Sequence, residues 1–238
     1  MSNKSQLVNQ SSDSDIELFD FNQSPTTISS INVTVINANE LNIEVKALDF
    51  VNLKQDNYQI VVWEGAITPP YEDIENNIVK REGIYSSTSK ATFTVTAESM
   101  DVNFYNGVYC VGFLMGDRLQ SVCSYSSLVG GAEVTVFQSV IYALTVSASQ
   151  ISIGFVTPNG NNPELNRQYI DVYSLDEPVR QENALNIIGH LSSYSAGQIV
   201  IKIKEGIKLE RGKSYRALYD FNKDFSSYGS EAIFTIPK

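Results

Sequence analysis

The chain has 238 residues, of which 42% are hydrophobic and 11% aromatic, and its formal net charge is −10. This length is enough for one large or two medium domains with a sizeable core. The negative charge argues against anionic partners, namely nucleic acids and anionic lipid surfaces. Thirteen Tyr and eleven Phe, with many Val, Ile and Thr, favour β structure.

Residues 1–28 are predicted to form a polar N-terminal arm. Ser, Asn, Gln and Asp dominate this segment, as in a disordered tail. An apolar patch interrupts it and gives a second interpretation, an arm that docks on a sheet edge or a neighbouring subunit. The interaction candidates in this patch are Ile16, Leu18, Phe19 and Phe21. We see no signal peptide here and no apolar membrane span, so we expect a cytoplasmic protein or export by a signal-independent route.

Beyond the arm, four segments recur in the same order about 105 to 111 residues later. A period of this size is that of a domain and not of a short-repeat solenoid. We therefore predict two domains, residues 29–132 and residues 133–238. The matching segments are Val33–Val45 with Leu144–Phe155, Tyr58–Glu64 with Tyr169–Tyr173, Ala91–Val95 with Ile199–Ile203, and Asn106–Phe113 with Gly212–Tyr219.

Each repeat consists of short runs in which apolar and polar residues alternate. Leu41, Ile43 and Val45 alternate with polar residues, which places one face of a strand in a core. Turn-prone clusters separate the runs, and about seven runs per repeat is typical of a sandwich. The predicted fold class is therefore all-β, with two tandem antiparallel β-sandwich domains after the arm.

Residues 209–219, LERGKSYRALY, resemble the corner before the sixth strand of immunoglobulin-like and fibronectin type III domains. In those families a tyrosine hydroxyl at this position bonds back onto the chain. The resemblance implies this role for Tyr215, and for Tyr109 in the first repeat. It concerns architecture and implies no particular function, because such sandwiches carry many.

Two cysteines, Cys110 and Cys123, flank the dipeptide Gly116-Asp117 at equal distances. If this dipeptide is a two-residue hairpin turn, the cysteines lie opposite each other and a disulfide is geometrically feasible. A longer connection breaks that register. Such a bridge forms only in an oxidising compartment, and we expect free thiols.

The sequence contains little that favours catalysis. Its one histidine, His190, lies in a loop setting, and neither a GxSxG elbow nor a phosphate-binding glycine loop is present. We therefore predict a non-enzyme without a cofactor. A weak calcium candidate remains in Asp220, Asn222, Asp224 and Glu231, which have the spacing of a calcium loop. Phe225 occupies the position where that loop needs glycine, so a polar turn is the preferred interpretation.

Aromatic residues next to polar loops are the last candidates, because they can stack on sugars or contact partners. They are Trp63, Tyr71, Tyr85, Tyr194 and Tyr228. The simpler interpretation places them in sheets as core or half-buried residues. We predict a structural or protein-interaction protein that assembles with itself through sheet edges and the arm. The alternative is a carbohydrate-binding or adhesive module, or a toxin or virulence component.

Overall fold

The computed structural model of the chain describes residues 26–99, 101–148, 150–187, 189–221 and 227–238. In these ranges the secondary structure consists of sixteen β-strands and one 3-10 turn, Gln181–Asn183. The strands form four antiparallel sheets. No helix of the described part is long and apolar enough to cross a membrane. The prediction of an all-β chain is confirmed, and the sheets are compatible with a β-sandwich architecture.

Residues 30–138 form two of the four sheets, and we call them the first half. The smaller sheet has the order β2-β3-β6 and the larger sheet the order β5-β4-β7-β8-β9. The smaller sheet contains β2 (Ser30–Asn37), β3 (Glu40–Lys46) and β6 (Lys90–Thr96). The larger contains β4 (Gln59–Glu64), β5 (Ile78–Gly83), β7 (Val108–Leu114), β8 (Val122–Val129) and β9 (Ala132–Gln138).

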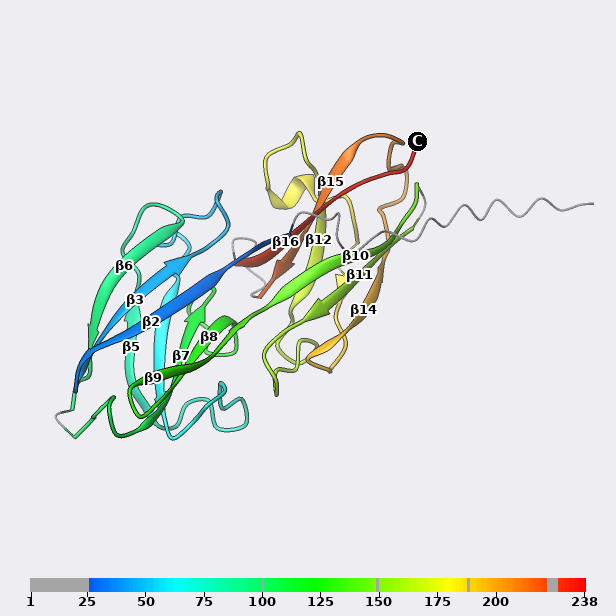
Figure 1. The fold of residues 1–238 in the computed structure, drawn as a ribbon. Helices are drawn as coiled ribbons and strands as arrows, with labels where there is room; N and C mark the ends of the chain where they lie inside the picture. Colours follow the sequence, from blue (N-terminus) through cyan, green and yellow to red (C-terminus); the bar gives the residue numbers. More distant parts are fainter. Residues whose placement is uncertain (1–25, 100, 149, 188, 222–226) are drawn as a thin grey trace, which may run out of the picture.

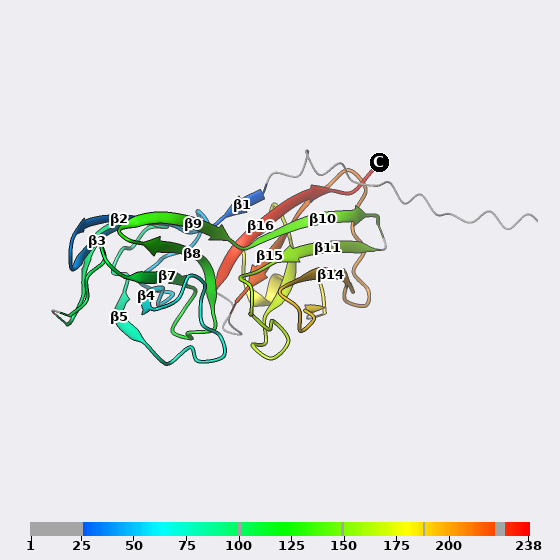
Figure 2. The same cartoon turned by 60° about the horizontal axis from the view of Figure 1, so that its bottom comes forward.

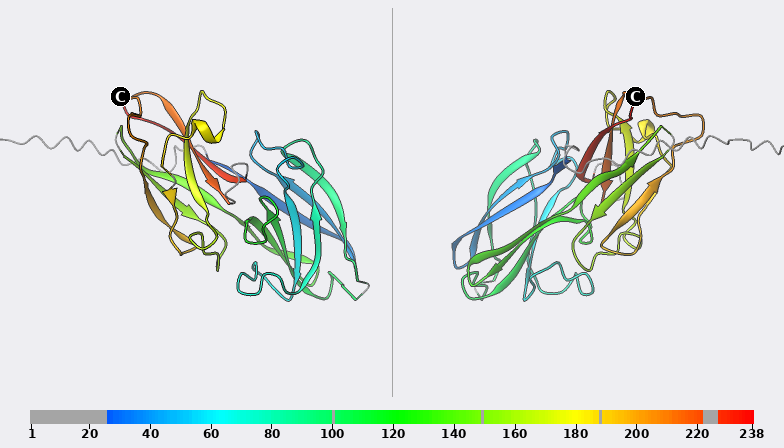
Figure 3. Two further views of the ribbon diagram at one scale, coloured as in Figure 1. Left: turned by 180° about the vertical axis from the view of Figure 1, so that it is seen from behind. Right: turned by 45° about the vertical axis from the view of Figure 1, so that its right-hand side comes forward.

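Residues 140–238 and the first strand of the structure form the other two sheets, which we call the second half. The orders are β10-β11-β14 and β1-β16-β15-β12-β13. The two halves lie side by side as separate lobes (Figures 1 and 3). The smaller sheet contains β10 (Val140–Val146), β11 (Ile151–Val156) and β14 (Ala196–Ile201). The larger contains β1 (Thr26–Ile28), β12 (Tyr169–Ser174), β13 (Gly189–His190), β15 (Ser214–Asp220) and β16 (Tyr228–Thr235).

The alternating runs of the sequence become strands with one buried face. On β3, Leu41, Ile43 and Val45 are buried, and the residues between them are not. By contrast, β4 is buried along Ile60–Trp63 without alternation. A continuous buried run means that this sheet is covered on both faces.

Both halves repeat the same pairing down to its irregularities. Phe113 pairs with Ser124 in the first half as Tyr219 pairs with Ser230 in the second, and a register shift follows at once in each. The loops before β4 and β12 also match. Asn57 and Arg167 occupy equivalent positions in them and have φ angles of 54° and 56°. The repeat seen in the sequence is therefore a repeat of backbone structure.

Each half also receives one strand from the start of the other repeat. Strand β1 precedes β2 of the first half but pairs with β16 of the second half. In the same way β9 precedes β10 of the second half but pairs with β8 of the first half. Figure 2 shows β1 beside β16, and β9 leading directly into β10. The edges of β8 and β16 are thus each covered by a strand that leads into the opposite half.

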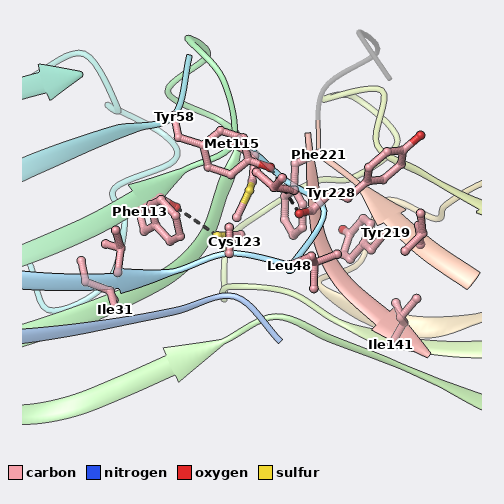
Figure 4. Close-up of a cluster of buried hydrophobic side chains, with 14 of the residues drawn as sticks. Ile31, Leu48, Tyr58, Phe113, Met115, Cys123, Ile141, Tyr219, Phe221 and Tyr228 are labelled. Carbon is pink, nitrogen blue, oxygen red and sulfur yellow. Dashed lines mark hydrogen bonds between the residues drawn. The ribbon is translucent and has the colours of Figure 1, made fainter. Parts of the chain in front are cut away.

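The two crossings meet where the halves touch. Ser29 connects β1 to β2, and Ser139 connects β9 to β10. Both serines are fully buried. The Ser29 N–H donates to the Gly229 carbonyl at 2.9 Å, and the Ser139 N–H donates to the Cys123 carbonyl at 2.8 Å. Buried apolar side chains of both halves form one continuous cluster here, seen in Figure 4. The labelled members are Ile31, Leu48, Tyr58, Phe113, Met115, Cys123, Ile141, Tyr219, Phe221 and Tyr228.

Both predicted corner tyrosines bond back onto the chain. The Tyr215 hydroxyl accepts the Glu210 N–H at 2.8 Å, and the Tyr109 hydroxyl accepts the Asn103 N–H at 3.2 Å. These contacts are those that the family resemblance implied, although they do not by themselves establish the family. The predicted domain limits, 29–132 and 133–238, stay a prediction.

Candidate functional site

On one side of the first half, the edge strands β5 and β6 of its two sheets lie next to each other. In their sheets β5 pairs only with β4, and β6 only with β3. Unpaired edges present backbone N–H and C=O groups that can bond another strand. On the opposite side of this half, β9 covers the edge of β8. The side of β5 and β6 is therefore one place in the first half where another segment can add, and β2 and β9 are the edge strands on the opposite side.

A cavity of about 440 Å³ lies between these two edges, and a second of about 290 Å³ continues it along β5. We call the two together the edge cleft. Buried Ile84 and half-buried Ala91 and Phe93 give it an apolar floor. Tyr85 lies on its rim with 80% of its surface exposed. The lining consists of Lys54, Asn57, Tyr58, Gln59, Glu82, Gly83, Ser86, Thr92, and the basic residues Arg81 and Lys90, besides those already named.

The edge cleft is basic, whereas the chain as a whole is acidic. Its lining contains Lys54, Arg81 and Lys90 but one acidic residue, Glu82. The Arg81 side chain is fixed in place, because its Nε donates to Gln59 Oε1 at 2.7 Å and Nη2 donates to the Asp117 carbonyl. A basic, partly apolar cleft between strand edges suits an extended segment with acidic and apolar residues.

The second half carries a different unusual feature, a buried polar layer on the larger sheet. Along β12 and β15 its side chains alternate with core residues, and the rings of Tyr173 and Tyr228 also pack in the buried apolar cluster. Arg216 and Glu231 form an ion pair at 3.2 Å, and the hydroxyls of Tyr173 and Tyr228 bond at 2.8 Å. The members of the polar layer are Asp171, Tyr173, Arg216, Asp220, Tyr228 and Glu231.

The first half has an apolar cluster at the equivalent positions. Trp63 pairs with Cys110 there, as Tyr173 pairs with Arg216 in the second half. Leu114 pairs with Val122, as Asp220 pairs with Tyr228. Because the same backbone is stable with apolar residues, the charges of the polar layer are not required by the fold. Burying them has a cost that the first half avoids.

Burial also changes the acidity of this layer. It raises the pKa of Asp171 to about 6, against an opposing effect of Lys204. Burial raises the pKa of Glu231 as well, where Arg216 opposes it and Asp49 adds to it. Asp171 Oδ2 is buried and bonds no described residue. The connection between β3 and β4 of the first half contacts the layer. The centroid of the Phe50 ring in this connection lies 5.8 Å from the Arg216 guanidinium carbon.

Of the aromatic candidates, Tyr85 and Tyr194 are exposed, whereas Trp63, Tyr71 and Tyr228 are buried or half-buried, as in the simpler interpretation. Trp63 is fully buried and its Nε1 donates to the Ile74 carbonyl at 2.8 Å, so its candidacy for surface contact is wrong. Tyr71 packs half-buried against the same cluster, with its hydroxyl buried. The segment 65–77 covers this face of the sheet, which is why both rings point inward. The arm candidates Ile16, Leu18, Phe19 and Phe21 lie outside the described residues.

The two cysteines are not opposite each other. Cys110 pairs with Ser127, and both thiols are free and buried. The connection between β7 and β8 runs from Met115 to Ser121 and is longer than a two-residue turn, so the predicted register is wrong. The Cys123 thiol instead donates to the Phe113 carbonyl at 3.4 Å. The free thiols agree with the expectation, whose premise, a reducing compartment, stays a prediction.

Two of the four calcium candidates lie among the described residues. Asp220 is fully buried at the end of β15, and Glu231 pairs with Arg216. Asn222 and Asp224 lie outside the described residues. In the described ranges no three His, Cys, Asp or Glu side chains are grouped closely enough to hold a metal ion.

Sequence reasoning missed the edge cleft and the polar layer, although both leave a trace. The run Lys80-Arg81 stands out in an acidic chain. Aligning the two repeats strand by strand would have placed Asp171 at the position equivalent to Val61, and Glu231 at the position equivalent to Tyr125. No protein-family model matches the chain, and comparison with curated proteins finds no relative.

Proposed function

We propose that this chain is a non-catalytic interaction protein with two tandem immunoglobulin-like or fibronectin III-like units. Its first half takes an extended segment of a protein partner between β5 and β6. The observation that carries the proposal is the edge cleft, which joins two unpaired strand edges to a cavity of about 440 Å³. Added strands gain main-chain hydrogen bonds from such edges, and side-chain pockets between them give specificity.

The tandem architecture is supported by the matched strand pairings of the two halves and by the two corner tyrosines, Tyr109 and Tyr215. The protein-binding role is supported by the apolar floor of the edge cleft. Ile84 is 4% exposed, and beside it Ala91 and Phe93 are half-buried on β6, which pairs only with β3. An apolar floor under unpaired backbone is what an added strand covers.

Hydrogen exchange of the β5 and β6 amides tests the proposal. The probe is a peptide of alternating Glu and Val, and we expect it to slow exchange along both edges. Ala91→Trp fills the cleft and should abolish the protection. Thr94→Trp places the same ring on the exposed face of the same strand and should leave it unchanged. Unaltered exchange with the peptide in excess would reject the proposal.

Carbohydrate binding is the second candidate, because Tyr85 is 80% exposed beside a cleft that holds amide and carboxylate side chains. An exposed aromatic ring with polar neighbours suits a sugar ring. A glycan array compares the unchanged chain with Tyr85→Ala. Binding that the variant loses would favour this role, and a silent array would reject it.

A further inference from the structure

The charges along β5 and β6 restrict which strand can add to them. Lys46 lies directly opposite Lys90 in the pairing of β3 with β6. Like charges in that position destabilise a sheet, and in the described part of the chain no ion pair engages either lysine. A cleft that carries Lys54, Arg81 and Lys90 repels a second copy of itself. It attracts a strand whose outward side chains are acidic.

The N-terminal arm has the pattern that this edge requires. Residues 13–18 have the sequence DSDIEL, so acidic residues alternate with Ser14, Ile16 and Leu18. As a strand, this segment has an acidic face and a mainly apolar face. The apolar face matches the floor of the edge cleft, and the acidic face matches its basic rim. The complementarity is therefore in both apolar character and charge.

The path of β1 indicates that the arm serves another copy. β1 is antiparallel to β16: Ile28 is opposite Ser230 and Thr26 is opposite Ala232. Going back along the chain, β1 thus leads away from Tyr228, whose carbonyl accepts a bond from the Tyr58 hydroxyl of the first half. Figure 2 shows β5 on the side of the first half away from β1. The N-terminal end of β1 therefore points away from the edge cleft of its own copy.

We propose that residues 13–18 of one copy lie as an added strand in the edge cleft of a second copy. This inference rests on the proposed function and names its partner. The contact joins two different surfaces of the chain, and such a head-to-tail contact propagates into linear assemblies unless its geometry closes a ring. Coulombic attraction across the rim makes the association weaker as salt rises.

A charge exchange in the full-length chain tests the inference by light scattering across a range of concentrations. Lys54→Glu with Lys90→Glu reverses the cleft, and Asp13→Lys, Asp15→Lys with Glu17→Lys reverses the arm. Each reversal should weaken association at least tenfold, and the two combined should restore it. The control Lys202→Glu with Lys208→Glu changes the net charge equally at exposed sites of the second half and should have no effect.

Three results would overturn the inference. The first is an unchanged chain that stays monomeric at every concentration. The second is a combined reversal that fails to restore association. The third is an arm reversal that speeds hydrogen exchange of the β5 and β6 amides in a chain that was monomeric before the change. The last result would mean that the arm occupies its own cleft. If the Glu-Val peptide still protects the two edges, only the partner is misassigned. If it does not, the proposed function fails as well.

Discussion

Replacing Asp171 should stabilise the protein, and the gain should depend on pH. Asp171 is 2% exposed, and its Oδ2 has no bond to a described residue. Burial raises its pKa to about 6, with Lys204 opposing. Asp171→Asn removes the charge with little change in shape. Asp171→Val installs the residue that the first half has at the equivalent position, Val61.

The size of the effect follows from the pKa. An unfolded aspartate has a pKa of about 3.9, and the difference from about 6 corresponds to about 3 kcal/mol. The pKa of this carboxyl is higher in the folded state than in the unfolded state. Folding is therefore more favourable with the carboxyl protonated than with it ionised. Its contribution is complete below about pH 4 and is lost as the pH rises through about 6. The Asn variant should therefore gain up to about 3 kcal/mol at pH 8 and little at pH 4.

Urea unfolding followed by circular dichroism at several pH values between 4 and 8 measures this difference. Other groups titrate in the same layer, including Glu231, whose pKa burial also raises. Subtracting the unchanged chain from the variant at each pH isolates Asp171. A difference that stays constant from pH 4 to 8, or a variant less stable at pH 8, would refute the reasoning.

Three further predictions concern the junction and the corner. Gly229→Ala places a Cβ 2.9 Å from the Cys123 Cβ, so calorimetry should show a loss of about 1–3 kcal/mol. A thiol reagent should find no reactive cysteine in the native chain and both after unfolding, because both are buried; rapid native labelling would contradict this. Tyr215→Phe removes the side-chain hydroxyl that accepts the Glu210 N–H and should cost about 1 kcal/mol, whereas exposed Tyr85→Phe should cost nothing measurable.

The sequence allowed the strands and their repeat to be predicted because both depend on local pattern. Period-two alternation identified the buried face of β3, and the comparison of Tyr109 with Tyr215 located equivalent strands. These features depend on which side chains can face a core, and that is visible in a short window. The corner bond depends on a few neighbouring residues and was predictable for the same reason.

Features that depend on distant segments were not predictable. Strand β1 is three residues long and has no periodicity, and its partner β16 lies at the other end of the chain. The inward position of Trp63 requires the segment 65–77 to cover the sheet. One signal was available, since the unbroken apolar run before Trp63 is typical of a strand buried on both faces.

The reciprocal placement of β1 and β9 bears on how this chain arose. If the two repeats were separate chains, each would give its first strand to the other and receive one in return. That is a closed, symmetric homodimer with exchanged strands. The present chain has the form such a dimer takes when gene duplication and fusion join its subunits. After fusion, one copy of each symmetric surface is free to diverge. The polar layer of the second half is such a divergence, because the equivalent positions of the first half hold an apolar cluster.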